Sequence, residues 1–197
     1  MDLSTIPYGR VHKRFAAPFE FAKPSWLETV GGTGVAVPNS AGYWDLSGAG
    51  TVTLRTAFDL ELGAYEQVAL YADGVHNPTS GQSLGLSFKG GSPAVRGVSI
   101  WSAVGAATST YRAFGSGTPD QQIPYYWGGV EATRRRNLGL IVRPARREVL
   151  LVMDDQVIWS RTELGMVLGD VRAVVDSGGL SGGGLRLAQF RLELQHN

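Results

Sequence analysis

Residues 137–161, NLGLIVRPARREVLLVMDDQVIWSR, contain three short runs in which apolar side chains recur at every second position. The runs are 138–142, 149–153 and 157–159. Polar turn sequences separate them, PARR at 144–147 and DD at 154–155. A period of two interrupted by turn residues is typical of antiparallel strands joined by tight turns. This stretch therefore predicts a β-meander and favours an all-β fold.

A second segment, residues 51–62, shows the same alternation at greater length. Its apolar face consists of Val52, Leu54, Thr56, Phe58, Leu60 and Leu62. The positions between them are mostly polar, and a helix would scatter the apolar set around its circumference. The pattern predicts one long, half-buried strand over 52–62.

Further alternating segments are separated by turns rich in Gly and Pro. They are 66–73, 83–89, 95–102 and 171–176. The chain of 197 residues holds 27 Gly and 9 Pro, which favours many strands and many turns over helices. We expect about a dozen strands, more than an immunoglobulin-type domain has, in a two-sheet antiparallel jelly-roll β-sandwich.

The chain is expected to form one domain with a short arm in front of it. Residues 1–17 are polar with a basic cluster at 10–14, and we interpret them as an N-terminal arm that frays or docks on a neighbouring subunit. Residues 18–197 are expected to form a single β-sandwich domain, since sandwiches of this length commonly fold as one unit.

Three stretches depart from simple alternation. Residues 105–136 are the least regular, and a loop region of that length is uncommon unless it serves a purpose or carries short strands. Residues 162–168 are expected to form one helical turn or a loop. In the last strand, 185–194, the apolar phase changes near 188–189, which predicts a β-bulge.

Composition excludes several classes of function. Lys and Arg number 18 and Asp and Glu 17, so no overall field attracts nucleic acid or an anionic membrane, and neither partner is expected. The absence of cysteine excludes disulfides, thiolate metal sites and a cysteine nucleophile. The first 21 residues lack the apolar run of a signal peptide, and no run reaches the length of a membrane span. We expect synthesis in the cytoplasm without a signal peptide.

The order of these segments resembles the concanavalin A-like lectin and glucanase sandwich. The resemblance rests on the long strand at 52–62, the meander that ends in MDDQVIWS at 153–160, and the closing strand LRLAQFRLEL at 185–194. It covers most of residues 18–197. It implies that a carbohydrate-binding or glycan-hydrolysing site is one candidate function.

A serine motif is the first candidate for catalysis. Residues 81–85, GQSLG, match the G-x-S-x-G nucleophile elbow of α/β-hydrolases, and the order Ser83, Asp154 or Asp170, His196 could be assembled from the chain. The elbow requires a strand before the serine and a helix after it. Here a loop precedes the serine and an alternating strand follows, so we interpret the motif as a chance match.

Paired acids are the second candidate, because glycosidases use two carboxylates. Asp59 and Glu61 alternate on one strand face, with Glu66 beyond a turn. The glucanases that the fold resembles carry E-x-D-x-x-E on one face, whereas DLELGAYE is interrupted at 63–64. A solvated outer face is the favoured interpretation, because exposure is the default for Asp and Glu. No catalytic residue is therefore expected.

Candidate metal ligands are Asp73 with His76 and Asn77, or Asp154 with Asp155. Neither set has EF-hand spacing, and two Asp residues between apolar strands are chiefly a turn signal. The carboxylate and Asn arrangement of the metal-binding lectins of this fold is not matched. No metal and no cofactor are expected.

Arginines at 134–136 are a candidate contact for phosphate or an acidic sugar, although a solvated loop or a subunit contact is favoured.

Five aromatic residues are the best candidates for ligand binding: Trp101, Tyr111, Tyr125, Tyr126 and Trp127. Flat rings provide contact area at low entropic cost, which suits sugar stacking or a protein contact. The alternative for one or two of them is packing in the core.

A short sandwich without cysteine or signal peptide, with a basic arm and an aromatic loop, is similar to the minor tail or fibre-associated proteins of tailed bacteriophages. This resemblance implies a non-enzymatic structural and binding protein of the virion tail. Its expected partners are other virion proteins, copies of itself in a homo-oligomer, and a host-surface carbohydrate. The alternative is a cellular lectin-like carbohydrate-binding protein or a glycoside hydrolase of the same fold.

Overall fold

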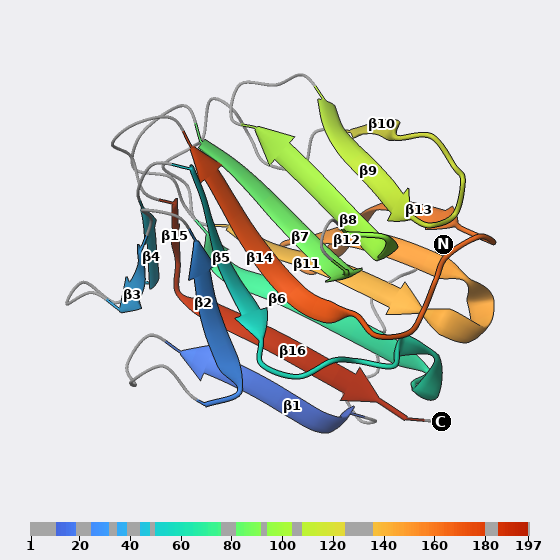
Figure 1. Ribbon diagram of the computed structural model, residues 1–197, viewed down its shortest axis with the longest axis horizontal. Coiled ribbons are helices and arrows are strands. Elements are labelled where there is room, and N and C mark those ends of the chain that lie inside the picture. Colours follow the sequence, from blue (N-terminus) through green and yellow to red (C-terminus); the bar gives the residue numbers. More distant parts are fainter. Residues whose placement is uncertain are drawn as a thin grey trace.

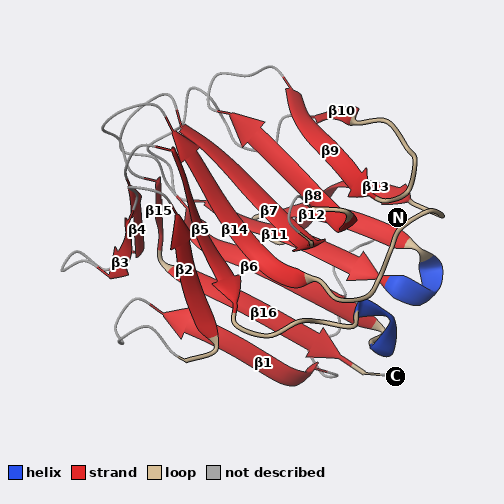
Figure 2. Cartoon of the chain, viewed as in Figure 1, coloured by secondary structure: helices blue, strands red, loops and turns tan. Residues whose placement is uncertain are grey.

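The computed structural model describes residues 11–18, 25–31, 35–38, 44–47, 50–75, 82–91, 94–103, 108–124, 136–179 and 185–196. Over these residues the chain forms two large antiparallel sheets packed face to face, with a small third sheet at one end (Figure 1). Helical conformation in the described part is confined to the 3-10 turns η2 (Leu62–Ala64) and η3 (Pro144–Arg146) (Figure 2). No helix among these residues could cross a membrane. The all-β jelly-roll sandwich is confirmed.

One large sheet has six strands in the order β1-β16-β6-β11-β12-β13. The strands are β1 (Val11–Pro18), β16 (Gln189–Gln195), β6 (Gln67–Val75), β11 (Arg136–Arg143), β12 (Glu148–Met153) and β13 (Gln156–Thr162). The last three confirm the predicted meander. Asp154 and Asp155 have φ of 49° and 66°, as the turn of a two-residue hairpin requires.

The other large sheet has seven strands in the order β10-β9-β8-β7-β14-β5-β2. They are β10 (Gln121–Pro124), β9 (Thr108–Phe114), β8 (Arg96–Ala103), β7 (Gln82–Gly90), β14 (Arg172–Gly179), β5 (Gly50–Thr56) and β2 (Leu27–Gly31). The small sheet consists of β15 (Leu185–Leu187), β4 (Trp44–Ser47) and β3 (Val35–Pro38).

The core lies between the two large sheets and is built from alternate residues of their strands. Fully buried members include Leu54, Leu70, Leu86, Phe88, Ile100, Leu140, Leu151, Val175, Phe190 and Leu192. Burial of each such side chain contributes about 1.5–3 kcal/mol. Because inward positions alternate, every second residue of these strands points away from the core.

The long strand predicted over 52–62 is shorter than expected. β5 ends at Thr56, whose hydroxyl donates to the carbonyl of Phe58 at 2.9 Å. Such a local side-chain bond offers the backbone an alternative to the ladder. Leu60 then forms an isolated bridge with Val171, and Leu62 begins η2. Leu60 and Leu62 are nevertheless buried, so the alternating pattern marked the core face correctly.

The predicted N-terminal arm is corrected over its second half. Residues 11–18 form β1, which pairs with β16 from Lys13–Leu194 to Pro18–Gln189 at the edge of the six-stranded sheet. Residues 1–10 lie outside the described residues.

The irregularity predicted at 188–189 separates two strands and is no bulge within one strand. β15 belongs to the small sheet and β16 to the six-stranded sheet, and between them the amide of Ala188 donates to the carbonyl of Asp73 at 2.9 Å. The change of apolar phase therefore marks the passage of the chain from one sheet to another. After β13 the chain forms a loop over 163–170, which was the second of the two alternatives for 162–168.

Candidate functional site

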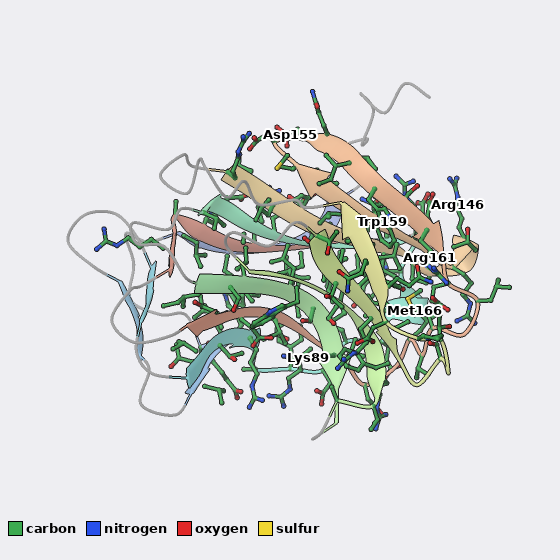
Figure 3. The ribbon with its side chains drawn as sticks, turned by 90° about the horizontal axis from the view of Figure 1, so that it is seen from above. Lys89, Arg146, Asp155, Trp159, Arg161 and Met166 are labelled. Carbon is green, nitrogen blue, oxygen red and sulfur yellow. The ribbon has the colours of Figure 1, made fainter. Side chains whose placement is uncertain are left out.

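The outer face of the seven-stranded sheet, meaning the face turned away from the core, is polar and hollowed. Its outward side chains include Glu28, Thr53, Arg55, Ser87, Lys89, Ser99, Trp101, Thr110, Arg112, Arg172 and Asp176. In Figure 3 Lys89 lies on this side of the molecule, opposite Asp155 of the meander. This face therefore combines an aromatic ring with polar side chains, and such polar groups can fix the orientation of a hydroxyl-rich ligand.

The first hollow has a volume of about 520 Å³ and crosses four strands of this sheet. It is lined by Ser87 and Lys89 of β7, Ser99 and Trp101 of β8, Thr110, Arg112 and Phe114 of β9, Asp176 of β14, and Asp120 from the loop before β10. Ser87 is buried at 2% exposure and lies on its floor. We call this first hollow the Trp101 hollow.

Trp101 lies flat across two neighbouring strands because both carry glycine beneath it. A Cβ atom placed on Gly85 of β7 would lie 2.9 Å from Cζ3 of the indole, and one on Gly178 of β14 would lie 3.0 Å from Cη2. Real Cβ atoms do not approach as closely as the one on Gly85 would, and the contact at Gly178 is tighter than most, so a side chain at either position would displace the ring. One face of the indole therefore rests on the backbone, and the other faces the hollow.

The acids of the Trp101 hollow are held by cations. Asp176, whose side chain is 5% exposed, accepts a hydrogen bond from the Thr53 hydroxyl at 2.6 Å and forms an ion pair with Lys89. Arg112 makes a two-pronged contact with Asp120, with Nε 2.7 Å from Oδ1. The hydrogen bond from Arg112 lowers the pKa of Asp120, so this carboxylate stays charged.

A second hollow of about 290 Å³ adjoins the first, and Lys89 lines both. The other lining residues are Val30, Thr53, Arg55, Asp59, Gly90, Gly91, Asp170, Arg172 and Val174. Glu28 accepts hydrogen bonds from Arg55 at 2.8 Å and from Arg172 at 3.0 Å. Arg172 also contacts Asp59 at 2.9 Å. We call this the Arg172 hollow.

The five predicted ligand-binding residues have different positions. Trp101 lines the first hollow. Tyr111 is 1% exposed and its ring lies 5.0 Å from that of Trp159, because odd-numbered residues of β9 face the core while Thr110 and Arg112 face outward. Tyr111 therefore follows the alternative of core packing. Tyr125, Tyr126 and Trp127 lie outside the described residues.

The serine motif does not form a nucleophile elbow. Ser83 lies within β7, and its hydroxyl donates to the carbonyl of Gly178 on β14 at 2.7 Å. Asp170 is paired with Arg96 at 2.6 Å, and the ring of His196 lies against Tyr65 at 4.7 Å. These contacts agree with the interpretation of a chance match.

The acids at 59 and 61 do not form a facing pair. Asp59 lines the Arg172 hollow and is paired with Arg172, whereas Glu61 accepts the backbone amide of Asp170 at 3.0 Å. Both residues are exposed, as the solvated interpretation expects.

Two of the candidate metal ligands, Asp73 and Asp154, have other partners. Asp73 is paired with Arg191 at 2.7 Å, and Asp154 accepts the amide of Asn137 at 2.9 Å and pairs with Arg136. His76, Asn77, Arg134 and Arg135 lie outside the described residues. Within the described ranges no group of three or more His, Asp or Glu residues could hold a metal ion.

Sequence comparison and structural comparison give different results. No family model and no curated protein matches the sequence. The fold is similar to the metal-free carbohydrate recognition domain of Emp46p, with a TM-score of 0.64 and 11% identity over 85% of this chain and 88% of that one. It is also similar to the Bacillus licheniformis β-glucanase, with a TM-score of 0.67 and 10% identity over 93% and 98% of the two chains.

A third similar structure is the metal-free exoplasmic/lumenal domain of VIP36, with a TM-score of 0.61 and 8% identity over 93% of this chain and 92% of that one. At identities this low the similarity concerns the fold alone. These structural matches confirm that the chain has the fold of the concanavalin A-like lectin and glucanase sandwich.

Proposed function

We propose that this protein binds carbohydrate in the Trp101 hollow and does not hydrolyse it. The observation that carries the proposal is the indole of Trp101, laid on Gly85 and Gly178 with its free face toward the hollow. The apolar face of a sugar ring stacks on such a surface. Ser99, Thr110 and other polar side chains of the lining are placed to hydrogen-bond the hydroxyl groups around the ring.

The similar structures support a carbohydrate ligand without identifying it. One is named as a carbohydrate recognition domain and another as a glucanase. Fold alone does not determine function, so the lining of the hollow has to carry the argument.

The state of the carboxylates favours binding over hydrolysis. A glycosidase needs one carboxylic acid with a raised pKa and a second carboxylate across the scissile bond. In the Trp101 hollow both acids are paired with cations, Asp176 with Lys89 and Asp120 with Arg112, and the pKa of Asp120 is lowered. Asp120, which Arg112 keeps charged, is therefore not suited to donate a proton at neutral pH.

The virion role remains a prediction from the sequence. None of the three similar structures described above is a virion protein. Virion partners, self-association and cytoplasmic synthesis likewise stay predictions from the sequence. A tail protein that recognises a host glycan and a cellular lectin-like protein both need the site proposed here.

The test is binding of the purified protein to a glycan array, followed by titration of the bound glycans. Trp101→Ala should weaken binding at least about thirtyfold, because truncation of an aromatic anchor commonly costs about 2 kcal/mol or more. Leu164→Ala, at a side chain 80% exposed and outside both hollows, is the control and should bind normally. Unchanged binding by Trp101→Ala would exclude this hollow. Release of shortened glycan would contradict the non-enzymatic proposal.

A further inference from the structure

We infer that the ligand is an uncharged oligosaccharide long enough to occupy both hollows, and not a single sugar or an acidic glycan. This inference rests on the proposed function and adds the length and charge of the ligand to it.

The two hollows adjoin at Lys89, and we call their combined lining the continuous site. Lys89 lines both of them. Asp176 of the Trp101 hollow accepts hydrogen bonds from Lys89 and from Thr53, and Thr53 lines the Arg172 hollow. The boundary between the hollows is therefore a set of hydrogen-bonded polar side chains that can themselves contact a ligand. No apolar ridge in the described lining separates them.

The continuous site crosses six adjacent strands, β9, β8, β7, β14, β5 and β2. Neighbouring strands lie about 4.8 Å apart, so the five intervals span about 24 Å. A single sugar ring stacked on Trp101 covers only one end of that distance. A linear chain that leaves Trp101 toward Val30 on β2 would contact polar groups along its whole length.

The charges of this site are already paired within the protein. Each cation on its lining has a carboxylate partner: Lys89 with Asp176, Arg112 with Asp120, Arg55 with Glu28, and Arg172 with Glu28 and Asp59. An acidic glycan would have to compete with these carboxylates for the same cations and would meet their negative charge.

The hydroxyl groups of a neutral sugar can bind to these ion pairs more favourably than the carboxylates of an acidic glycan. A guanidinium has five N–H donors, and a carboxylate has lone pairs beyond those used in one ion pair. An arginine–carboxylate pair therefore still offers donors and acceptors in fixed positions. Arg172 uses Nε for Asp59 and Nη1 for Glu28, which leaves further N–H groups available beside the hollow.

The test compares linear neutral oligosaccharides of glucose and of mannose, from two to six units, with galacturonate oligomers of the same lengths, by calorimetric titration. Affinity for a neutral series should rise at least about tenfold between the disaccharide and the pentasaccharide, which corresponds to about 1.4 kcal/mol. Galacturonate oligomers should bind more weakly than neutral ones of equal length.

Val30→Glu should remove the gain from length and leave the disaccharide affinity unchanged, since Val30 lines only the Arg172 hollow and is 41% exposed. Val95→Glu is the matched control, because Val95 is 53% exposed and lines neither hollow.

The outcomes separate this inference from the proposed function. If all neutral lengths bind equally and still depend on Trp101, the function stands and the two-hollow ligand is wrong. If galacturonate oligomers bind more tightly than neutral ones, the uncharged ligand is wrong. If neither series binds and the array is negative, both proposals fail.

Discussion

The outer faces of the two large sheets each carry an aromatic ring laid over glycine, but the two rings have different surroundings. Trp101 lies over Gly85 and Gly178 and faces a hollow. On the six-stranded sheet Tyr71 lies over Gly139, where an added Cβ would be 2.7 Å from the ring. Above Tyr71 the guanidinium of Arg191 sits 3.9 Å from the ring centroid.

The surroundings of Tyr71 are closed. Tyr71 is 5% exposed, and the apolar side chains beside it, Ile141, Leu150 and Val152, are at most 3% exposed. Arg191 is held by Asp73 and Glu193, and although burial opposes its charge, their hydrogen bonds raise its pKa above the ordinary value. A ring that lies on glycine is therefore available to a ligand only when nothing in the protein occupies its second face.

The largest expected loss of stability comes from removing Arg191, which covers the ring of Tyr71 on the six-stranded sheet. Arg191→Ala removes the cation that pairs with both Asp73 and Glu193 in a buried setting. We expect a loss of about 3–5 kcal/mol in the free energy of unfolding, as for other broken buried ion pairs. Chemical denaturation measures it. The glycan affinity of the folded fraction should not change, and a stability within 1 kcal/mol of wild type would show that the network is not needed.

The glycines offer the sharpest contrast between the faces. Gly139→Ala should destabilise the fold by about 1–3 kcal/mol, because Tyr71 is confined between the new methyl group and Arg191. Gly85→Ala should cost less stability, since Trp101 can lift into the hollow, but it should abolish the flat platform and with it glycan binding. Thermal denaturation and titration together separate the two results. Equal stability losses, with binding retained in Gly85→Ala, would contradict this comparison.

Much of the fold could be predicted because alternation and turn residues are local. The meander at 137–161 and the core face of 52–62 follow directly from the period of two. The end of β5 at Thr56 could not be predicted in this way, since it coincides with a side-chain hydrogen bond to Phe58. The strand β1 was missed because its pairing partner, β16, lies at the other end of the chain.

The site was less accessible to sequence reasoning. Trp101 was among the aromatic candidates, but the two glycines beneath it belong to other strands, and Lys89 and Asp176 are 87 positions apart. Only strand order brings such residues together. A local signal was the polar phase of β7, in which Ser83, Ser87 and Lys89 alternate with core residues; it marked an outer face without indicating its purpose.

Tyr111 provides a smaller test, from the core side of the same sheet. Burial, followed by the charge of Glu163, raises the pKa of its phenol above the ordinary value near 10. The unfolded chain therefore loses this proton at lower pH than the folded protein does, and the free energy of unfolding should fall as pH rises above about 10. Tyr111→Phe should weaken this alkaline loss in denaturation curves measured from pH 8 to 11.

At neutral pH Tyr111→Phe should change stability by less than about 1 kcal/mol, because the hydroxyl lies near the Glu163 carboxylate but makes no hydrogen bond of good geometry among the described residues. A large loss at neutral pH would mean that the hydroxyl is paired and that Tyr111 contributes more than packing.

The smallest expected effect concerns Asp120 at the rim of the Trp101 hollow. Its folded pKa is lowered by Arg112, so the pair contributes stability above the unfolded value near 4, and that contribution is lost as pH falls through the folded pKa. Both side chains are exposed, and solvent keeps the effect on unfolding small.

The effect of the same titration on binding is more informative, because Arg112 lines the hollow where the sugar is proposed to stack. Glycan affinity should decline below pH 4 in the wild type. Asp120→Asn should show the weaker affinity already at neutral pH, with a flatter profile in acid. If the variant binds as tightly as the wild type at every pH, the orientation of Arg112 does not contribute to glycan recognition. Stacking on Trp101 must then account for the affinity without the Arg112–Asp120 pair.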